Sequence, residues 1–137
     1  MLLIATLVAV VILSIGDVAE TADANVSAKA EVGTCFGESS SKAPVSCSGS
    51  HSFEVFMAVE YGDLAEHPGD ASFWRTNEAC DAEFSGYVGK TYLLSRYDYI
   101  EVFTDESEWA AGNRRSVCAL YFDDGTSTTW PARDSGR

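Results

Sequence analysis

The sequence is short of positive charge. It has 9 lysines and arginines against 21 aspartates and glutamates, which gives a formal net charge of −12. Nucleic acids and anionic membrane surfaces are both bound through clusters of Lys and Arg, so the composition argues against either partner. A solvated acidic surface is the simplest interpretation, and it leaves cations or basic proteins as possible partners.

Motifs for metal binding and catalysis are also missing. The cysteines are spaced C-x11-C-x32-C-x37-C, without the CxxC pair of zinc fingers. There is no G-x-S-x-G elbow, no glycine-rich phosphate loop and no D-x-[DN]-x-[DN]-G calcium loop. The sequence therefore predicts no cofactor, no metal site and no enzymatic activity.

The N-terminus, in contrast, is a long apolar run. Residues 2–15 carry no charge, and Ala22-Asp23-Ala24 is a small-x-small cleavage site. Residues 1–16 are predicted to be a signal peptide or a membrane anchor, although about 20 apolar residues are needed to span a bilayer. Both interpretations predict export. The domain is either anchored and faces the cell exterior, or is secreted after cleavage behind Ala24, and the membrane is contacted through the N-terminal segment only.

Four cysteines in an exported chain predict two disulfides. Three pairings are possible, and we favour Cys35–Cys47 with Cys80–Cys118, the local pairing that crosses no loops. In the chain-entropy model each bridge stabilises the fold by roughly 3–4 kcal/mol.

The residue pattern predicts a linker over residues 17–31, one domain over residues 32–130 and a disordered tail over residues 131–137. Short strands are expected at 33–36 and 43–47, a half-buried strand at 53–61 and a central apolar strand at 117–122. One or two strands are expected within 92–103, and Asp123-Asp124-Gly125 predicts a hairpin into 127–130. In the strand at 53–61 the apolar residues share one face and Glu54 lies on the exposed one.

One main helix is expected after Asp70, its predicted N-cap, with Gly89 at its C-terminal end. Its core-facing side is predicted to hold Phe73, Asn77, Cys80, Phe84 and Tyr87/Val88. The predicted fold class is α+β, a small antiparallel sheet of about five strands packed against one main helix and stapled by two disulfides.

Two pairs of residues are candidates for a site. His51 with Glu54 has four interpretations: a zinc ligand if Cys47 is free, a catalytic base oriented by Glu54, an anchor for the loop before the strand, or part of a ligand-binding site. For Trp109 with Arg114 we expect the guanidinium to stack on the indole. That pair either fills the core beside the Cys80–Cys118 bridge or forms a surface patch for a partner.

Four fragments occur in a characteristic order. They are Gly33-Thr34-Cys35-Phe36, Cys47-x-x-x-His51-x-x-Glu54-Val55, Pro68-Gly69 ahead of Cys80, and Trp109-Ala110-Ala111-Gly112-Asn113-Arg114-x-x-x-Cys118. Over about residues 32–125 the chain resembles the septum formation domain family, small exported or membrane-anchored proteins mostly of actinobacteria. The resemblance implies a cell-envelope location more firmly than a chemistry.

The expected function is therefore a non-enzymatic extracytoplasmic domain that binds a protein or another component of the envelope. Two alternatives remain, a small exported hydrolase that uses His51 and a secreted effector or inhibitor.

Overall fold

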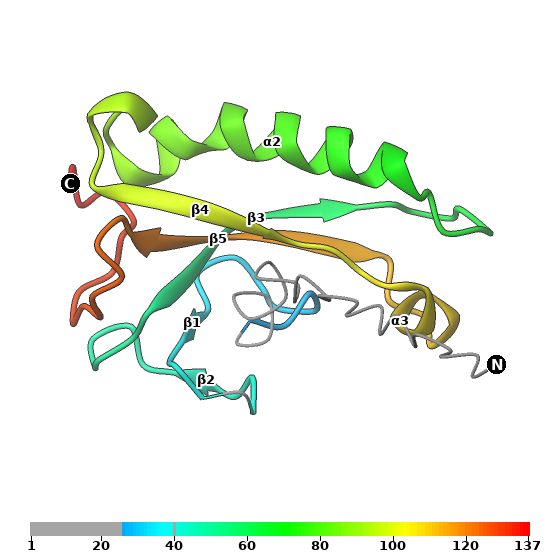
Figure 1. Cartoon of the computed structure of the whole chain (residues 1–137), viewed down its shortest axis with the longest axis horizontal. Helices are drawn as coiled ribbons and strands as arrows, with labels where there is room; N and C mark the ends of the chain where they lie inside the picture. Colours follow the sequence, from blue (N-terminus) through cyan, green and yellow to red (C-terminus); the bar gives the residue numbers. More distant parts are fainter. Residues whose placement is uncertain (1–25, 40) are drawn as a thin grey trace, which may run out of the picture.

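The computed structural model describes residues 26–39 and 41–137; the predicted signal peptide or anchor lies outside them. Five strands form one antiparallel sheet in the order β2-β1-β3-β5-β4, and helix α2 lies across one face of it (Figure 1). The elements are β1 Cys35–Phe36, β2 Pro44–Val45, β3 Phe53–Glu60, α2 Asp70–Val88, the 3-10 turn η1 Tyr92–Leu94, β4 Tyr97–Val102, α3 Glu106–Ala110 and β5 Arg115–Phe122. The α+β prediction is confirmed.

Strand β5 is the centre of the sheet, as its apolar sequence predicts. It pairs with β3 on one side and β4 on the other, and residues 116–120 are all buried. A strand covered on both faces cannot alternate polar and apolar residues, which explains its continuous apolar run.

Strand β3 departs from the predicted pattern. Its register against β5 shifts between Val55 and Met57, where the strand carries a bulge. One extra residue reverses the parity of the side chains, so Val55 and Val59 lie in different clusters on opposite faces. The prediction that the odd-numbered residues share one face is wrong, and so is the exposed position of Glu54, which is 3% exposed.

Helix α2 confirms the predicted core positions of Cys80, Phe84, Tyr87 and Val88 but differs in its first half, where Ser72 and Thr76 are buried in place of Phe73 and Asn77. Its buried side is formed by Ser72, Thr76, Cys80, Phe84, Tyr87 and Val88, and Phe73 is 43% exposed. Gly69 occupies the N-cap position in place of Asp70, whereas Gly89 ends the helix in the left-handed conformation that the sequence predicts.

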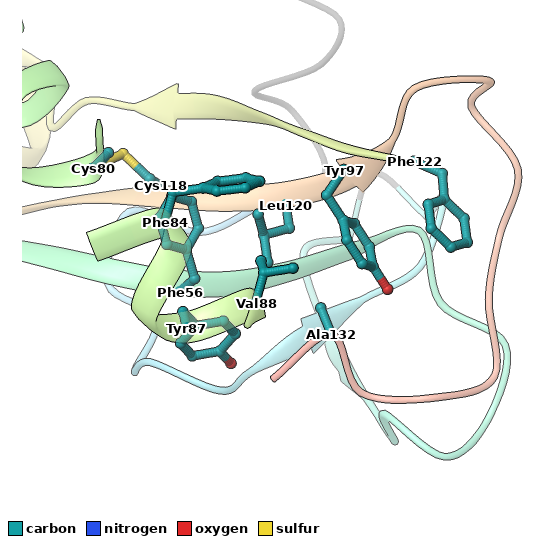
Figure 2. Packing of buried hydrophobic residues seen from close by; sticks show 10 residues of the cluster. All are labelled: Phe56, Cys80, Phe84, Tyr87, Val88, Tyr97, Cys118, Leu120, Phe122 and Ala132. Carbon is teal, nitrogen blue, oxygen red and sulfur yellow. A yellow bond between two sulfur atoms is a disulfide. The ribbon is translucent and has the colours of Figure 1, made fainter. Parts of the chain in front are cut away.

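Both predicted disulfides are present, with Cα–Cα distances of 5.4 Å for Cys35–Cys47 and 6.3 Å for Cys80–Cys118. The second joins α2 to β5 inside the main core. Figure 2 shows this core, which consists of Phe56, Cys80, Phe84, Tyr87, Val88, Tyr97, Cys118, Leu120, Phe122 and Ala132.

A second core lies on the opposite face of the sheet. Its buried members are Val26, Ala28, Phe36, Val55, Val102, Val117 and Ala119. Because Val26 and Ala28 are buried here, the described part of the predicted linker belongs to the folded domain. Arg115 also holds this segment, through Glu31 at 3.0 Å and the carbonyl oxygen of Ala30 at 2.9 Å.

The C-terminal residues are also part of the fold. The N–H of Asp134 donates a hydrogen bond to the carbonyl oxygen of Tyr87, and the N–H of Gly136 donates one to the carbonyl oxygen of Val88, both with a donor–acceptor distance of 2.8 Å. These carbonyls end α2 and have no partner within the helix, so the segment satisfies groups that would otherwise remain unpaired. The predicted disordered tail is wrong.

The predicted hairpin strand at 127–130 is wrong as well. Thr128 makes a single bridge, with His51, because the chain leaves β5 and turns back toward the start of β3.

Candidate functional site

His51 lies buried at the corner where the loop from Cys47 enters β3. Its Nδ1 is 2.8 Å from the carbonyl oxygen of Gly49, and its Nε2 is 3.3 Å from Thr128 Oγ1. The first contact requires an N–H on Nδ1, and the threonine hydroxyl can either donate to Nε2 or accept from it. Both ring nitrogens are therefore engaged in holding two loops together, as the structural interpretation predicts.

Glu54 is the buried acid of this corner. Its Oε2 accepts a hydrogen bond from the N–H of Ala132 at a distance of 2.5 Å, and this bond connects the C-terminal segment to β3. Burial raises the pKa of Glu54 above its usual value, and that backbone hydrogen bond and the nearby His51 and Arg133 oppose the shift only in part. None of the ion pairs among the described residues includes Glu54.

The Tyr87 phenol completes the polar cluster beneath α2. Burial and the neighbouring Glu54 raise the pKa of Tyr87 to about 12, so it is a neutral hydroxyl at physiological pH. The Arg133 guanidinium lies 4.7 Å from the centre of its ring.

The Cys35–Cys47 bridge lies directly beside Glu54. Cys35 is the partner of Glu54 in the β1–β3 register, so their side chains share a face of the sheet. The two sulfur atoms and one carboxylate oxygen lie within 4.8 Å of one another. Because both sulfurs are in the disulfide, they are not available as thiolate ligands for zinc.

Trp109 is an interior residue that is 5% exposed. It packs with Val59 and Tyr61 in a third cluster, apart from the cluster that contains the Cys80–Cys118 bridge. The Arg114 guanidinium stacks at 4.0 Å from the ring centre and donates to the Trp109 carbonyl oxygen over 2.6 Å. The predicted stacking is present. The burial supports a role in the core rather than an exposed patch.

Arginine–aromatic stacking recurs throughout the domain. Five of the six arginines lie 4.0–5.5 Å from an aromatic ring centre, namely Arg75, Arg96, Arg114, Arg133 and Arg137. The sixth, Arg115, pairs with Glu31 and Glu60. Of these five arginines, only Arg96 also forms an ion pair among the described residues, with Asp124.

An aromatic patch that the sequence did not predict lies near the start of α2. We define it as Phe73, Trp74 and Phe103; the Phe73 ring centre is 5.2 Å from that of Trp74 and 6.0 Å from that of Phe103. Trp74 is 70% exposed. The adjacent aromatics Phe73 and Trp74 were a usable signal, because two neighbours on a helix cannot both face the core centre.

The patch adjoins the free edge of the sheet. Along an antiparallel strand, every second residue forms its hydrogen bonds with the neighbouring strand. The N–H of Asp123 donates to the carbonyl oxygen of Arg96, so the even-numbered residues of β4 bond to β5. The odd-numbered residues of β4 therefore direct their N–H groups away from the sheet. Two of these outward N–H groups have side-chain acceptors: the N–H of Tyr97 donates to Ser95 Oγ, and the N–H of Tyr99 donates to Asp98 Oδ1. The end of β4 nearest the patch has no such side-chain acceptor among the described residues.

A family profile described as septum formation matches residues 13–118. The chain belongs to the septum formation family. The match includes all four cysteines together with His51, Glu54, Trp109 and Arg114, and it ends at Cys118, before the C-terminal segment that closes the core. No curated protein matches the chain. No solved structure matches it either.

Two disulfides in this septum formation domain are consistent with folding in an oxidising compartment outside the cytoplasm. Within residues 26–39 and 41–137, no helix has the length and apolarity needed to span a bilayer.

Proposed function

We propose that this septum formation domain is a non-enzymatic extracytoplasmic binding module that docks another cell-envelope protein on its aromatic patch. The observation that carries the proposal is the exposed Trp74 beside Phe73 and Phe103. Exposed aromatic clusters of this kind are typical of interaction sites, where Trp contributes much of the binding energy.

The charge around the patch selects the partner. Asp70 and Glu78 lie four residues to either side of Trp74, on the same side of α2. Glu101, on β4, accepts a hydrogen bond from Asn77 of the helix over 2.7 Å. An apolar anchor framed by carboxylates fits a protein segment that carries Lys or Arg next to a large apolar residue.

The contacts of His51 support binding rather than hydrolysis. A general base needs a free nitrogen within reach of a nucleophile and a substrate. Here Nδ1 is bonded to Gly49, and Nε2 faces Thr128, whose hydroxyl is buried.

Site-specific photocrosslinking in intact cells tests the docking surface. A photoreactive residue replaces Phe73 in one strain and Leu93 in the other; Leu93 is 91% exposed and lies in η1, beyond the opposite end of α2. We expect a discrete protein adduct from position 73 that is lost when Trp74→Ser is added and weakens with increasing salt. Equal adducts from both positions, or none from position 73, would contradict the proposal.

A further inference from the structure

The Cys35–Cys47 bridge and Glu54 together form a site that the binding role does not use. A buried carboxylic acid is costly unless it is paired, and the single hydrogen bond from Ala132 needs only a neutral acceptor such as Gln. Burial outweighs the groups that favour the charged form, His51, Tyr87 and Arg133, so the carboxylate gains no net stabilisation at this position. Buried titratable groups beside reactive atoms are a recurrent feature of functional sites.

The two sulfurs differ in their access to solvent. Cys35 lies on β1 and is 1% exposed, whereas Cys47 is half-buried in a turn on the polar loop before β3. Cys47 is therefore the more exposed half of the bridge, with its Sγ 3.3 Å from the carbonyl oxygen of Gly33, while Cys35 is covered. In the other bridge, Cys80 and Cys118 are both fully buried.

We propose that Cys35–Cys47 is an exchange-competent disulfide in which Cys47 is the sulfur attacked by an external thiolate and Glu54 protonates the departing Cys35. The geometry that carries this is the carboxylate oxygen within 4.8 Å of both sulfurs. That separation lets a proton pass after a small rotation of the released thiolate or through one water.

The incoming thiolate bonds to Cys47 Sγ, the Sγ–Sγ bond breaks, and its electron pair leaves on Cys35 Sγ. The proton on the Glu54 carboxyl passes to that sulfur, which leaves a Cys35 thiol, a Glu54 carboxylate and a mixed disulfide at Cys47. The incoming thiol is oxidised and Cys35 is reduced. A second thiol on the same partner would resolve the mixed disulfide and release Cys47.

The surroundings of Glu54 favour this role. His51 from the loop, Tyr87 from α2 and Arg133 from the C-terminal segment are the titratable and charged groups that face it. Burial outweighs them and raises the pKa of Glu54, so a larger fraction of the acid carries a proton to donate. The pKa of a solvent-exposed glutamate would leave almost none at neutral pH.

The test is exchange of the folded protein with reduced glutathione, followed by rapid alkylation and peptide mass spectrometry. In the unsubstituted protein we expect the mixed disulfide on Cys47, formed at least about tenfold faster than any adduct at Cys80 or Cys118. We expect Glu54→Gln to slow the exchange about 100-fold, the lower end of general acid catalysis. Glu38→Gln is the matched control, because it removes the same charge from an exposed position on the loop between the two cysteines.

The pH dependence separates proton donation from a structural effect. With rates divided by the concentration of glutathione thiolate, the unsubstituted protein should slow as pH rises through the raised pKa of Glu54, and Glu54→Gln should be flat. An adduct on Cys35, equal rates at the two bridges, or a flat profile in the unsubstituted protein would each overturn the proposal. The adduct position and the profile of the unsubstituted protein decide it even if Glu54→Gln fails to fold.

Discussion

At the scale of single residues, Glu54 makes folding sensitive to pH. Its pKa is raised by burial in the folded state, so the folded protein holds this proton more tightly than the unfolded chain does. The contribution of Glu54 to stability therefore falls as pH rises from the unfolded pKa through the folded one.

We predict that Glu54→Gln becomes progressively more stable than the unsubstituted protein as pH rises through that window. The amide keeps the acceptor for the Ala132 N–H and has no charge to bury. Urea denaturation at pH 4, 6 and 8 measures the difference in the free energy of unfolding. A difference that shrinks with rising pH would show that the carboxylate is stabilised in the folded state.

Arg114 offers a second prediction at this scale. Arg114→Ala removes the guanidinium stacked on Trp109 and the hydrogen bond to its carbonyl oxygen. We expect a loss of about 2 kcal/mol in the free energy of unfolding. Arg114→Lys keeps the charge without the planar fork and should recover only part of the loss. Denaturation followed by tryptophan fluorescence measures both variants, and full recovery by Lys would refute the stacking argument.

At the scale of elements, the two glycines near the end of α2 have opposite roles. Gly89 has a φ of +81°, whereas Gly86 lies in the helix with open space around its Cα. We predict that Gly89→Ala destabilises the domain by about 1–2 kcal/mol and that Gly86→Ala stabilises it by up to about 1 kcal/mol. Thermal melts of the two variants test the pair. Equal changes in melting temperature for the two variants would mean that helix propensity alone determines the effect of each substitution on stability.

What sequence reasoning could predict also depends on the element. The central strand β5 and the C-terminal end of α2 follow from local signals, the apolar run and Gly89, and the structure confirms both. The bulge in β3 has no local signal, because alternation remains visible in the sequence while one extra residue changes the face on which each side chain lies. The exposed position predicted for Glu54 failed for a different reason, because the C-terminal segment covers the face of β3 on which this residue lies.

The contacts of the candidate site also fall into two groups, those between residues close in the sequence and those between distant residues. The stacking of Arg114 and the contact of His51 with Gly49 follow from local neighbours, whereas the contact of His51 with Thr128 joins residues 77 positions apart. The burial of Glu54 depends on Ala132, which is 78 residues further along the chain. Sequence patterns of short range cannot predict such a contact.

At the scale of the whole molecule, the C-terminal segment closes the fold. We predict that deleting residues 131–137 costs about 3 kcal/mol, because it uncovers the main core and removes four hydrogen bonds to the rest of the domain, three donated by the N–H groups of Ala132, Asp134 and Gly136 and one accepted by the Arg137 carbonyl oxygen from Ser95. Removing Arg137 alone should cost less than about 1 kcal/mol. Urea denaturation and limited proteolysis compare the two. A truncated chain as stable as the full one would show that residues 131–137 are dispensable.

The burial of Val26 fixes how far the domain can stand from a membrane. If residues 1–16 anchor the chain, residues 17–25 separate the bilayer from Val26, the first buried side chain in the part of the chain that the structure describes. Nine residues span at most about 30 Å even when fully extended. The tether then holds the domain within roughly one domain diameter of the lipid, and any partner on the aromatic patch has to be present in that same thin layer.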